Sequence, residues 1–123
     1  MSDHPDAIGN IRLFQSRQGV KASLDGLLLA RWLAPRPGWR IADLGCGNGF
    51  VGLLMASAHP LCRVTGIEIQ DVLLRQAANS ARLNHLNNIS FLRADIRHPP
   101  WKDNAGIFDL VAVNPPYRKG WSL

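Results

Sequence analysis

Four consecutive residues near the end of the chain combine hydrogen-bond acceptors with a rigid backbone. Asn114, Pro115, Pro116 and Tyr117 directly follow the apolar run IFDLVAV. The Asn114 side-chain oxygen and a neighbouring backbone carbonyl can each accept one N–H, while the prolines fix the backbone and remove competing donors. Tyr117 adds a ring on which a planar group can stack. Such a set is suited to holding a planar amino group.

The chemistry of that amino group explains why two acceptors are needed. A planar amino nitrogen is a poor nucleophile because its lone pair is delocalised into the adjoining ring or carbonyl. Two acceptors for its N–H bonds hold the nitrogen toward tetrahedral geometry and aim the lone pair at an electrophile. They also lie where positive charge develops during an in-line displacement. The motif is therefore compatible with group transfer to an amino nitrogen, a reaction for which it would need no general base.

A second set of residues lies earlier, in the stretch DLGCGNG. Gly45, Gly47 and Gly49 allow positive backbone angles and a close approach of the main chain to a ligand. A helix that begins at Phe50 would turn its first amide groups toward the same ligand. Asp43 precedes the glycines at the end of an apolar run. The pattern predicts a binding loop between a strand and a helix.

Two kinds of ligand fit this loop. Residues 47–52 satisfy the GxGxxG pattern of dinucleotide sites, and Glu68 ends the next apolar run, where a ribose-binding acid belongs. NAD is therefore one candidate. Asp43 argues against it, because its charge would meet an incoming pyrophosphate at close range and suits a cationic ligand better.

The elements that position these residues alternate along the chain. Residues 1–10 are expected to be loose, and residues 107–113 form the last expected strand. Ser23 is predicted to cap a helix with Leu24, Leu27 and Leu28 buried, and Asp71 to cap a later helix. The expected strands are 11–15, 39–44, 62–68, 89–95 and 107–113, and the expected helices are 24–34, 50–58 and 72–84. Strands that alternate with helical crossovers predict an α/β, Rossmann-like parallel sheet in a single domain over residues 1–123.

Composition limits the classes of partner. The chain has 123 residues, is 46% hydrophobic and carries a net charge of +5 with a sequence pI near 10. This balance suits a polyanion such as RNA, although ordinary solvated surface explains it equally well. With no apolar run long enough for a membrane and no signal-like start, we expect a cytoplasmic protein. Cys46, Cys62 and four scattered histidines lack metal-ligand spacing, so we expect no metal.

The stretch DLGCGNG resembles the first motif of class I S-adenosylmethionine-dependent methyltransferases, and the later elements follow that family's order. The resemblance implies that S-adenosylmethionine is the cofactor, whose methionine part is held by Asp43 and the glycine loop. It implies that Glu68 accepts the ribose hydroxyls and that Asp95 accepts the adenine amino group. The cofactor-binding set expected from it is Lys21, Ser23, Asp25, Asp43, Gly45, Cys46, Gly47, Asn48, Gly49, Glu68, Ile69, Asp95, Ile96 and Asn114.

The motif at residues 114–117 resembles that of the family members that methylate planar amino nitrogens. The resemblance assigns the catalytic roles to Asn114, Pro115, Pro116 and Tyr117, with the Pro115 carbonyl as second acceptor. The stretches QSRQGVK and SLDGLLLARW resemble the opening segment of bacterial N6-adenine tRNA methyltransferases, which implies an RNA substrate. Glutamine methylation of a release factor, a cofactor-binding module without catalysis, and an NAD-binding domain remain open as alternatives.

The chain also departs from the family. The family's sheet has seven strands in the order 3-2-1-4-5-7-6, and the sequence supplies the first four, so a truncated sheet of order 3-2-1-4 is expected. Residues 1–22 form an N-terminal extension, and residues 23–117 form the cofactor-binding core with its motif. The strand at Ile107 to Val113 becomes an apolar edge, from which we expect self-association and weakened turnover.

Overall fold

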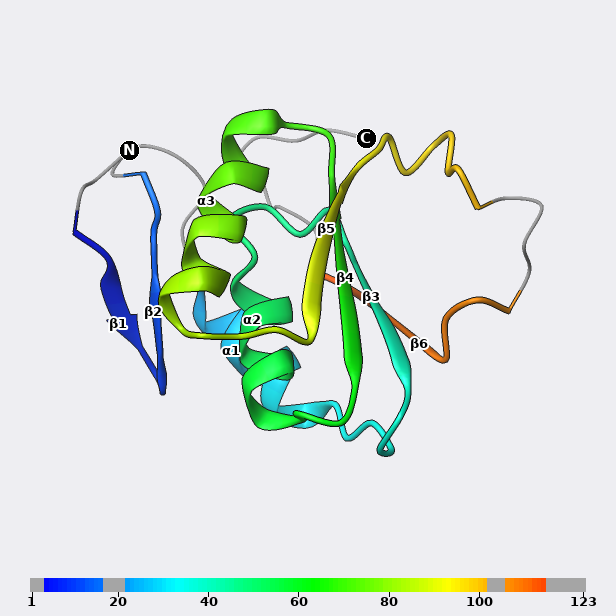
Figure 1. The fold of residues 1–123 in the computed structure, drawn as a ribbon, viewed down its shortest axis with the longest axis horizontal. Helices are drawn as coiled ribbons and strands as arrows, with labels where there is room; N and C mark the ends of the chain where they lie inside the picture. Colours follow the sequence, from blue (N-terminus) through cyan, green and yellow to red (C-terminus); the bar gives the residue numbers. More distant parts are fainter. Residues whose placement is uncertain (1–3, 17–21, 102–105, 115–123) are drawn as a thin grey trace.

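The structure is a computed structural model, and it describes residues 4–16, 22–101 and 106–114. Figure 1 shows a layer of helices packed against one face of a twisted sheet, with a small hairpin beside them. The elements in chain order are β1 (Asp6–Ile8), β2 (Ile11–Leu13), α1 (Leu24–Trp32), β3 (Arg40–Leu44), α2 (Phe50–Ala58), β4 (Arg63–Glu68), α3 (Asp71–Leu83), β5 (Ile89–Arg93) and β6 (Leu110–Val113).

The main sheet confirms the predicted topology. Its strands lie in the order β5-β4-β3-β6, and each neighbouring pair is parallel. The first of these strands along the chain, β3, is therefore central, and the third and fourth lie at the edges. The order reverses between β3 and β6, and α/β sheets bind ligands at the carboxyl edge of such a point.

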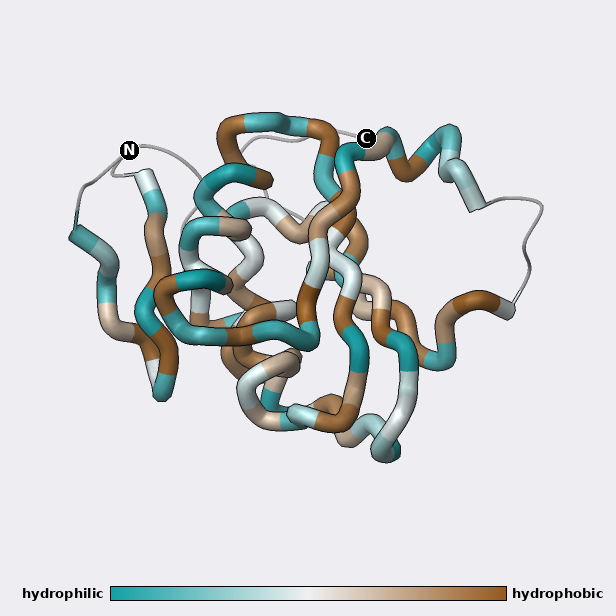
Figure 2. Tube along the Cα trace, in the orientation of Figure 1, coloured by the Kyte–Doolittle hydropathy of each residue, from teal (hydrophilic) through white to brown (hydrophobic). Residues whose placement is uncertain are grey.

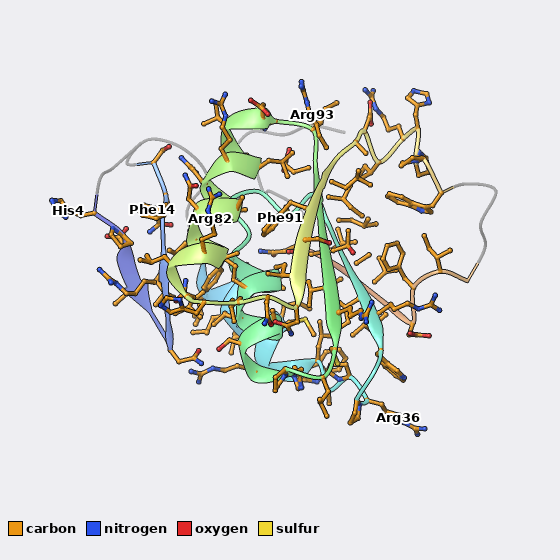
Figure 3. The ribbon with its side chains drawn as sticks, in the orientation of Figure 1. His4, Phe14, Arg36, Arg82, Phe91 and Arg93 are labelled. Carbon is orange, nitrogen blue, oxygen red and sulfur yellow. The ribbon has the colours of Figure 1, made fainter. Side chains whose placement is uncertain are left out.

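The core lies between the sheet and the helices. Ile41, Val64, Ile89 and Leu110 are partners in the strand register and belong to one apolar cluster with α2. Phe91, labelled in Figure 3, points from β5 toward the helices. In Figure 2 hydrophobic stretches run through the strands and α2, and hydrophilic ones mark the outer turns. Among the described residues, no helix is long and apolar enough to cross a membrane.

Helix α1 is capped by Ser23 as predicted, since the Ser23 hydroxyl accepts from the Gly26 N–H at 3.2 Å. The predicted buried face is confirmed only at Leu27, which is half-buried and packs against the core cluster. Leu24 and Leu28 are 68% and 56% exposed, whereas Gly26 and Ala30 are buried. Gly26 lets the backbone of α1 come close to α2, because a Cβ atom there would lie 3.1 Å from the Phe50 ring.

Helix α3 begins one residue away from the expected cap. Gln70 occupies the N-cap position without a side-chain bond, and Asp71 is the first helical residue, paired with Arg75 at 2.6 Å. Leu74 and Ala77 lie on the face of α3 that packs inward and are buried. Ala81 of the same face is buried too.

The last two strands are shorter than expected. Strand β5 ends at Arg93, because the Asp95 carboxylate accepts bonds from Arg97 and turns the chain. Strand β6 begins at Leu110 rather than at residue 107. The Asp109 carboxylate accepts the Arg40 N–H at 2.8 Å, which fixes the entry into the strand.

The N-terminal segment is not loose from residue 4 onward. Strands β1 and β2 pair antiparallel in a hairpin with Gly9 at φ 60°. Ile11 and Leu13 are buried in the core cluster. The expected strand 11–15 is therefore limited to three residues and gains a partner that the polar sequence of residues 4–8 did not indicate.

Three polar side chains of α3 hold this hairpin in place. The Gln76 amide donates to the Ser16 hydroxyl at 2.8 Å, and the Ser80 hydroxyl accepts the Phe14 N–H at 2.8 Å. The Asn84 amide accepts the Arg12 N–H and donates to the Arg12 carbonyl, at 2.8 and 2.6 Å. We call these three pairs the α3 ladder. Figure 3 shows Phe14 on the hairpin, beside α3.

Candidate functional site

The loop between β3 and α2 has the backbone that the glycines predicted. Gly45, Gly47 and Gly49 have φ values of 63°, 57° and 88°. Gly49 is the N-cap of α2, and a Cβ atom there would lie 2.9 Å from the Cβ of Ala77. The left-handed backbone and the close approach of α3 therefore both require glycine at position 49.

Asp43 lies beneath this loop. Its side chain is almost fully buried, and its carboxylate accepts the Gly52 N–H at 3.0 Å. Burial raises the pKa of Asp43 to about 7, the Gly52 N–H opposes this rise, and the negative charge of Glu68 adds to it. A buried carboxylate with a single backbone donor is an unsatisfied negative charge, which a cationic ligand would stabilise.

Glu68, at the end of β4, ties the loop to the next strand. One carboxylate oxygen accepts the Gly47 N–H at 3.0 Å, and the other accepts the Ile69 and Gln70 N–H groups at 2.9 and 3.0 Å. These bonds fix both oxygens at the carboxyl edge. The oxygen bonded to Gly47 retains lone-pair capacity for a hydroxyl donor. Ile69 is 49% exposed beside it.

The remaining loop residues are buried. The Cys46 N–H donates to the Ile67 carbonyl at 2.9 Å, and its sulfur lies 3.0 Å from where a Cβ of Gly66 would be. Burial, with Asp43 and Glu68 nearby, raises the pKa of the Cys46 thiol, so it is no nucleophile. The Asn48 side-chain oxygen accepts the Phe50 N–H at 3.3 Å and shapes the turn.

Asp95 has a different environment. Its carboxylate accepts bonds from three nitrogens of Arg97: the backbone N–H at 2.9 Å, Nε at 3.0 and 3.2 Å to the two oxygens, and the terminal nitrogen at 2.7 Å. The side-chain bond to Arg97 is the main reason that the pKa of Asp95 falls to about 2. Ile96 is 48% exposed. The predicted adenine-binding acid is thus engaged by its own neighbour.

A small pocket of about 50 Å³ brings together three parts of the chain that lie far apart in sequence. It joins the start of α1, the end of β3 with its loop, and the end of β6. Its lining residues are Ser23, Asp43, Gly45, Cys46, Gly47, Asn48, Phe50, Val51 and Asn114. The acid of the first motif and the amide of the last motif therefore share one pocket.

The other predicted residues stand apart from this pocket. Glu68, Ile69, Asp95 and Ile96 follow the ends of β4 and β5 along the same edge, and Asp25 is exposed on α1. Lys21, Pro115, Pro116 and Tyr117 lie outside the described residues. A larger hollow of about 650 Å³ lies at the amino ends of the strands, lined by Arg40, Arg63 and Phe108 among others, and no predicted site residue contributes to it.

Sequence reasoning missed three residues around the pocket. Phe50 and Val51 line it, although as apolar residues opening a helix they carry no sequence signal of a site. Gly26 lies close to Asn114. The sequence signal for this residue was a glycine in the first turn of a helix, where glycine is unfavourable. Among the residues that the structure describes, no three His, Cys, Asp or Glu side chains gather as metal ligands.

Comparison with known proteins identifies relatives of two kinds. The chain is 36% identical over 83 residues to a release factor glutamine methyltransferase of Aliivibrio fischeri, covering 65% of this chain and 28% of the relative. It is 34% identical over 99 residues to a tRNA1(Val) (adenine(37)-N6)-methyltransferase of Glaesserella parasuis, covering 80% and 41%. The chain thus spans less than half the length of these relatives.

Solved structures agree with these relatives. TrmN from Thermus thermophilus superposes with a TM-score of 0.64 at 33% identity, over 74% of this chain and 27% of that one. A precorrin-6y C5,15-methyltransferase from Geobacter metallireducens gives a TM-score of 0.68 at 15% identity, covering 82% and 53%, which shows the fold alone. Residues 35–117 match the family described as "Methyltransferase domain". With its parallel sheet, its glycine loop and this match, the chain belongs to the methyltransferase domain family.

Proposed function

We propose that the chain takes part in S-adenosylmethionine-dependent methyl transfer to an exocyclic amino nitrogen, with adenine N6 of a tRNA as the substrate. The observation that supports this best is the shared pocket of Asp43 and Asn114. A group that binds a cation and a group that accepts amino N–H bonds lie side by side, as methyl transfer from a sulfonium to nitrogen requires.

The residues present fit the cofactor. Asp43 is a buried carboxylate suited to the ammonium group in the methionine part of the cofactor. The glycine loop leaves room for the rest of this methionine part. Glu68 has its oxygens fixed at the next strand end, where they can accept from a ribose diol. When bound, S-adenosylmethionine supplies an electrophilic methyl group on a positively charged sulfur.

The role proposed for Asn114 is to prepare the nucleophile. Its side-chain oxygen accepts one N–H of the substrate amino group, and the Pro115 carbonyl accepts the other. The lone pair is then directed at the methyl carbon, and the positive charge that develops on nitrogen is stabilised by both oxygens. In this proposal Tyr117 stacks on the base, and the methylated nitrogen loses its proton to water.

The basic composition supports an RNA substrate. The net charge is +5, and the relatives of greater coverage are tRNA methyltransferases. Glutamine methylation of a release factor is the second candidate, favoured by the 36% identity to an enzyme of that kind. Transfer of a labelled methyl group to total tRNA and, separately, to release factor distinguishes the two.

Calorimetry tests the cofactor independently of the substrate. We expect S-adenosylhomocysteine to bind and NADH not to bind, because the buried Asp43 repels a pyrophosphate. Binding of NADH without binding of S-adenosylhomocysteine would refute the proposed function and favour the dinucleotide alternative.

We also propose that the edge at Ile107 to Val113 mediates self-association. In the part of the chain that the structure describes, β6 pairs with β3 on one side and with no strand on the other. Val111 and Val113 are 51% and 49% exposed. An apolar strand with an open edge is a template for pairing with a second copy.

A further inference from the structure

The first turn of α1 lies against the side chain of Asn114. A Cβ atom at Gly26 would lie 3.1 Å from Asn114 Nδ2 and 3.1 Å from Cδ1 of the Phe50 ring. Both distances are shorter than ordinary van der Waals contacts of a methyl group. The Asn114 amide and the Phe50 ring therefore occupy the space that any side chain at position 26 would need.

The backbone at Gly26 does not itself require glycine. Gly26 is a helical residue and is absent from the glycines with positive φ. Glycine in a helix interior costs about 1 kcal/mol relative to alanine. Glycine at position 26 weakens the helix and is not required by the backbone conformation. We therefore attribute it to the close contacts of this position, which are with Asn114 and Phe50.

The start of α1 is held firmly, so a side chain at position 26 could not be accommodated by shifting the helix. The Ser23 hydroxyl accepts the Gly26 N–H, and the Ser23 carbonyl accepts the Leu27 N–H at 3.1 Å. One residue earlier, the Gln15 side chain accepts the Ala22 N–H at 2.9 Å. A methyl group at position 26 would therefore press on the Asn114 amide and on the Phe50 ring.

We infer that Gly26 is a positioning residue for Asn114, which sets the orientation of the side-chain amide that faces the amino group of the substrate. The nitrogen of that amide is the atom next to Gly26, and Asn114 is one of the residues that line the pocket. The inference rests on the proposed function, because it assumes that the Asn114 oxygen is the acceptor. A methyl group at position 26 would displace the amide by a few tenths of an ångström or more.

The test compares Gly26→Ala and Gly26→Leu with Leu28→Gly as matched control. Leu28 lies in the same helix, is 56% exposed and is absent from the pocket lining, so its change to glycine weakens α1 without touching Asn114. The readouts are calorimetric affinity for S-adenosylhomocysteine, single-turnover methyl transfer to tRNA by the full chain, and the Asn114 side-chain amide resonance, assigned by its loss in Asn114→Asp.

For Gly26→Ala we expect affinity for S-adenosylhomocysteine within about twofold of the native chain and transfer slower by roughly tenfold or more, equivalent to about 1.4 kcal/mol of activation free energy. The Asn114 amide resonance shifts in Gly26→Ala and stays in place in Leu28→Gly. For Gly26→Leu we expect no transfer. The resonance measurement needs no turnover, so it tests the contact by itself.

Two results separate this inference from the proposed function. If Asn114→Ala transfers methyl groups at the native rate, the proposed role of Asn114 fails. If Asn114→Ala abolishes transfer while Gly26→Ala transfers normally with an unmoved Asn114 resonance, the inference about Gly26 is wrong. Equal losses in Gly26→Ala and Leu28→Gly would also overturn it, since a general disturbance of α1 would then explain the effect without a contact to Asn114.

Discussion

Replacing Asp43 by asparagine should stabilise the ligand-free protein at alkaline pH while weakening cofactor binding. The asparagine side-chain oxygen can accept the Gly52 N–H as the carboxylate does at 3.0 Å, and the side chain has nearly the same volume. The change removes the buried negative charge and adds an amide NH2 group at the same buried position. Active-site substitutions usually cost stability or leave it unchanged, so an increase would identify the charge as the cause.

The size of the effect follows from the pKa of Asp43. Burial raises this pKa from 3.8 to about 7, a difference of about 3. One pKa unit corresponds to about 1.4 kcal/mol, so ionised Asp43 destabilises the folded state by an amount on the order of 4 kcal/mol as an upper limit. The sign is that of a carboxyl with a raised pKa: its contribution to stability is full below about pH 3.8 and is lost as the pH rises to about 7.

Urea denaturation at pH 4, 6 and 8, without cofactor, measures this effect. The difference in unfolding free energy between Asp43→Asn and the native chain should grow from pH 4 to pH 8 and favour the variant by roughly 2–4 kcal/mol at pH 8. Titrating groups that do not interact with Asp43 cancel in this difference. A difference that is independent of pH, or a variant less stable than the native chain at pH 8, would refute the reasoning.

Three further predictions concern other parts of the molecule. Ser80→Ala leaves the Phe14 N–H without its acceptor, so we expect a loss of about 1–3 kcal/mol in unfolding free energy and faster hydrogen exchange at Phe14; unchanged exchange would contradict the α3 ladder. Arg97→Ala should raise the pKa of Asp95 from about 2 toward its usual value and tighten S-adenosylhomocysteine binding. Carboxyl NMR titration measures the first effect and calorimetry the second, and an unaltered titration of Asp95 would contradict the prediction. Light scattering should detect self-association that is reduced by Val111→Lys, and a dispersed monomer of the native chain at high concentration would count against pairing through β6.

The fold and the site could be predicted from the sequence where a residue type has one dominant structural role. The alternation of apolar runs with helical patterns predicted the four parallel strands, and the glycines of DLGCGNG predicted a left-handed loop, which the φ values of Gly45, Gly47 and Gly49 confirm. Asp43 was expected at a strand end facing the loop, and it lies there, buried.

Prediction failed where the burial of a residue depends on contact with a segment that is distant in the sequence. Leu24 and Leu28 match a helical apolar face, yet α1 faces the core through Gly26 and Ala30, with Leu27 and Leu29 half-buried beside them. Gln76 and Ser80 are polar residues on a helix and would be expected to face solvent. They are fully buried because the hairpin, itself unpredicted at its first strand, and the residues after it cover them and bond to the Gln76 amide nitrogen and the Ser80 hydroxyl.

The α3 ladder restricts how this part of the protein can change during evolution. Its helical members are four residues apart, a rise of about 6 Å, and its extended members are two residues apart, a rise of about 6.6 Å. The two spacings nearly coincide. A hairpin displaced by two residues could therefore form the same kind of hydrogen bonds with the ladder member four residues further along α3. An insertion of a single residue would turn every extended partner to the opposite face. We therefore expect length variation between Arg12 and Ser16 among relatives to occur in steps of two residues, each matched by a shift of four along α3.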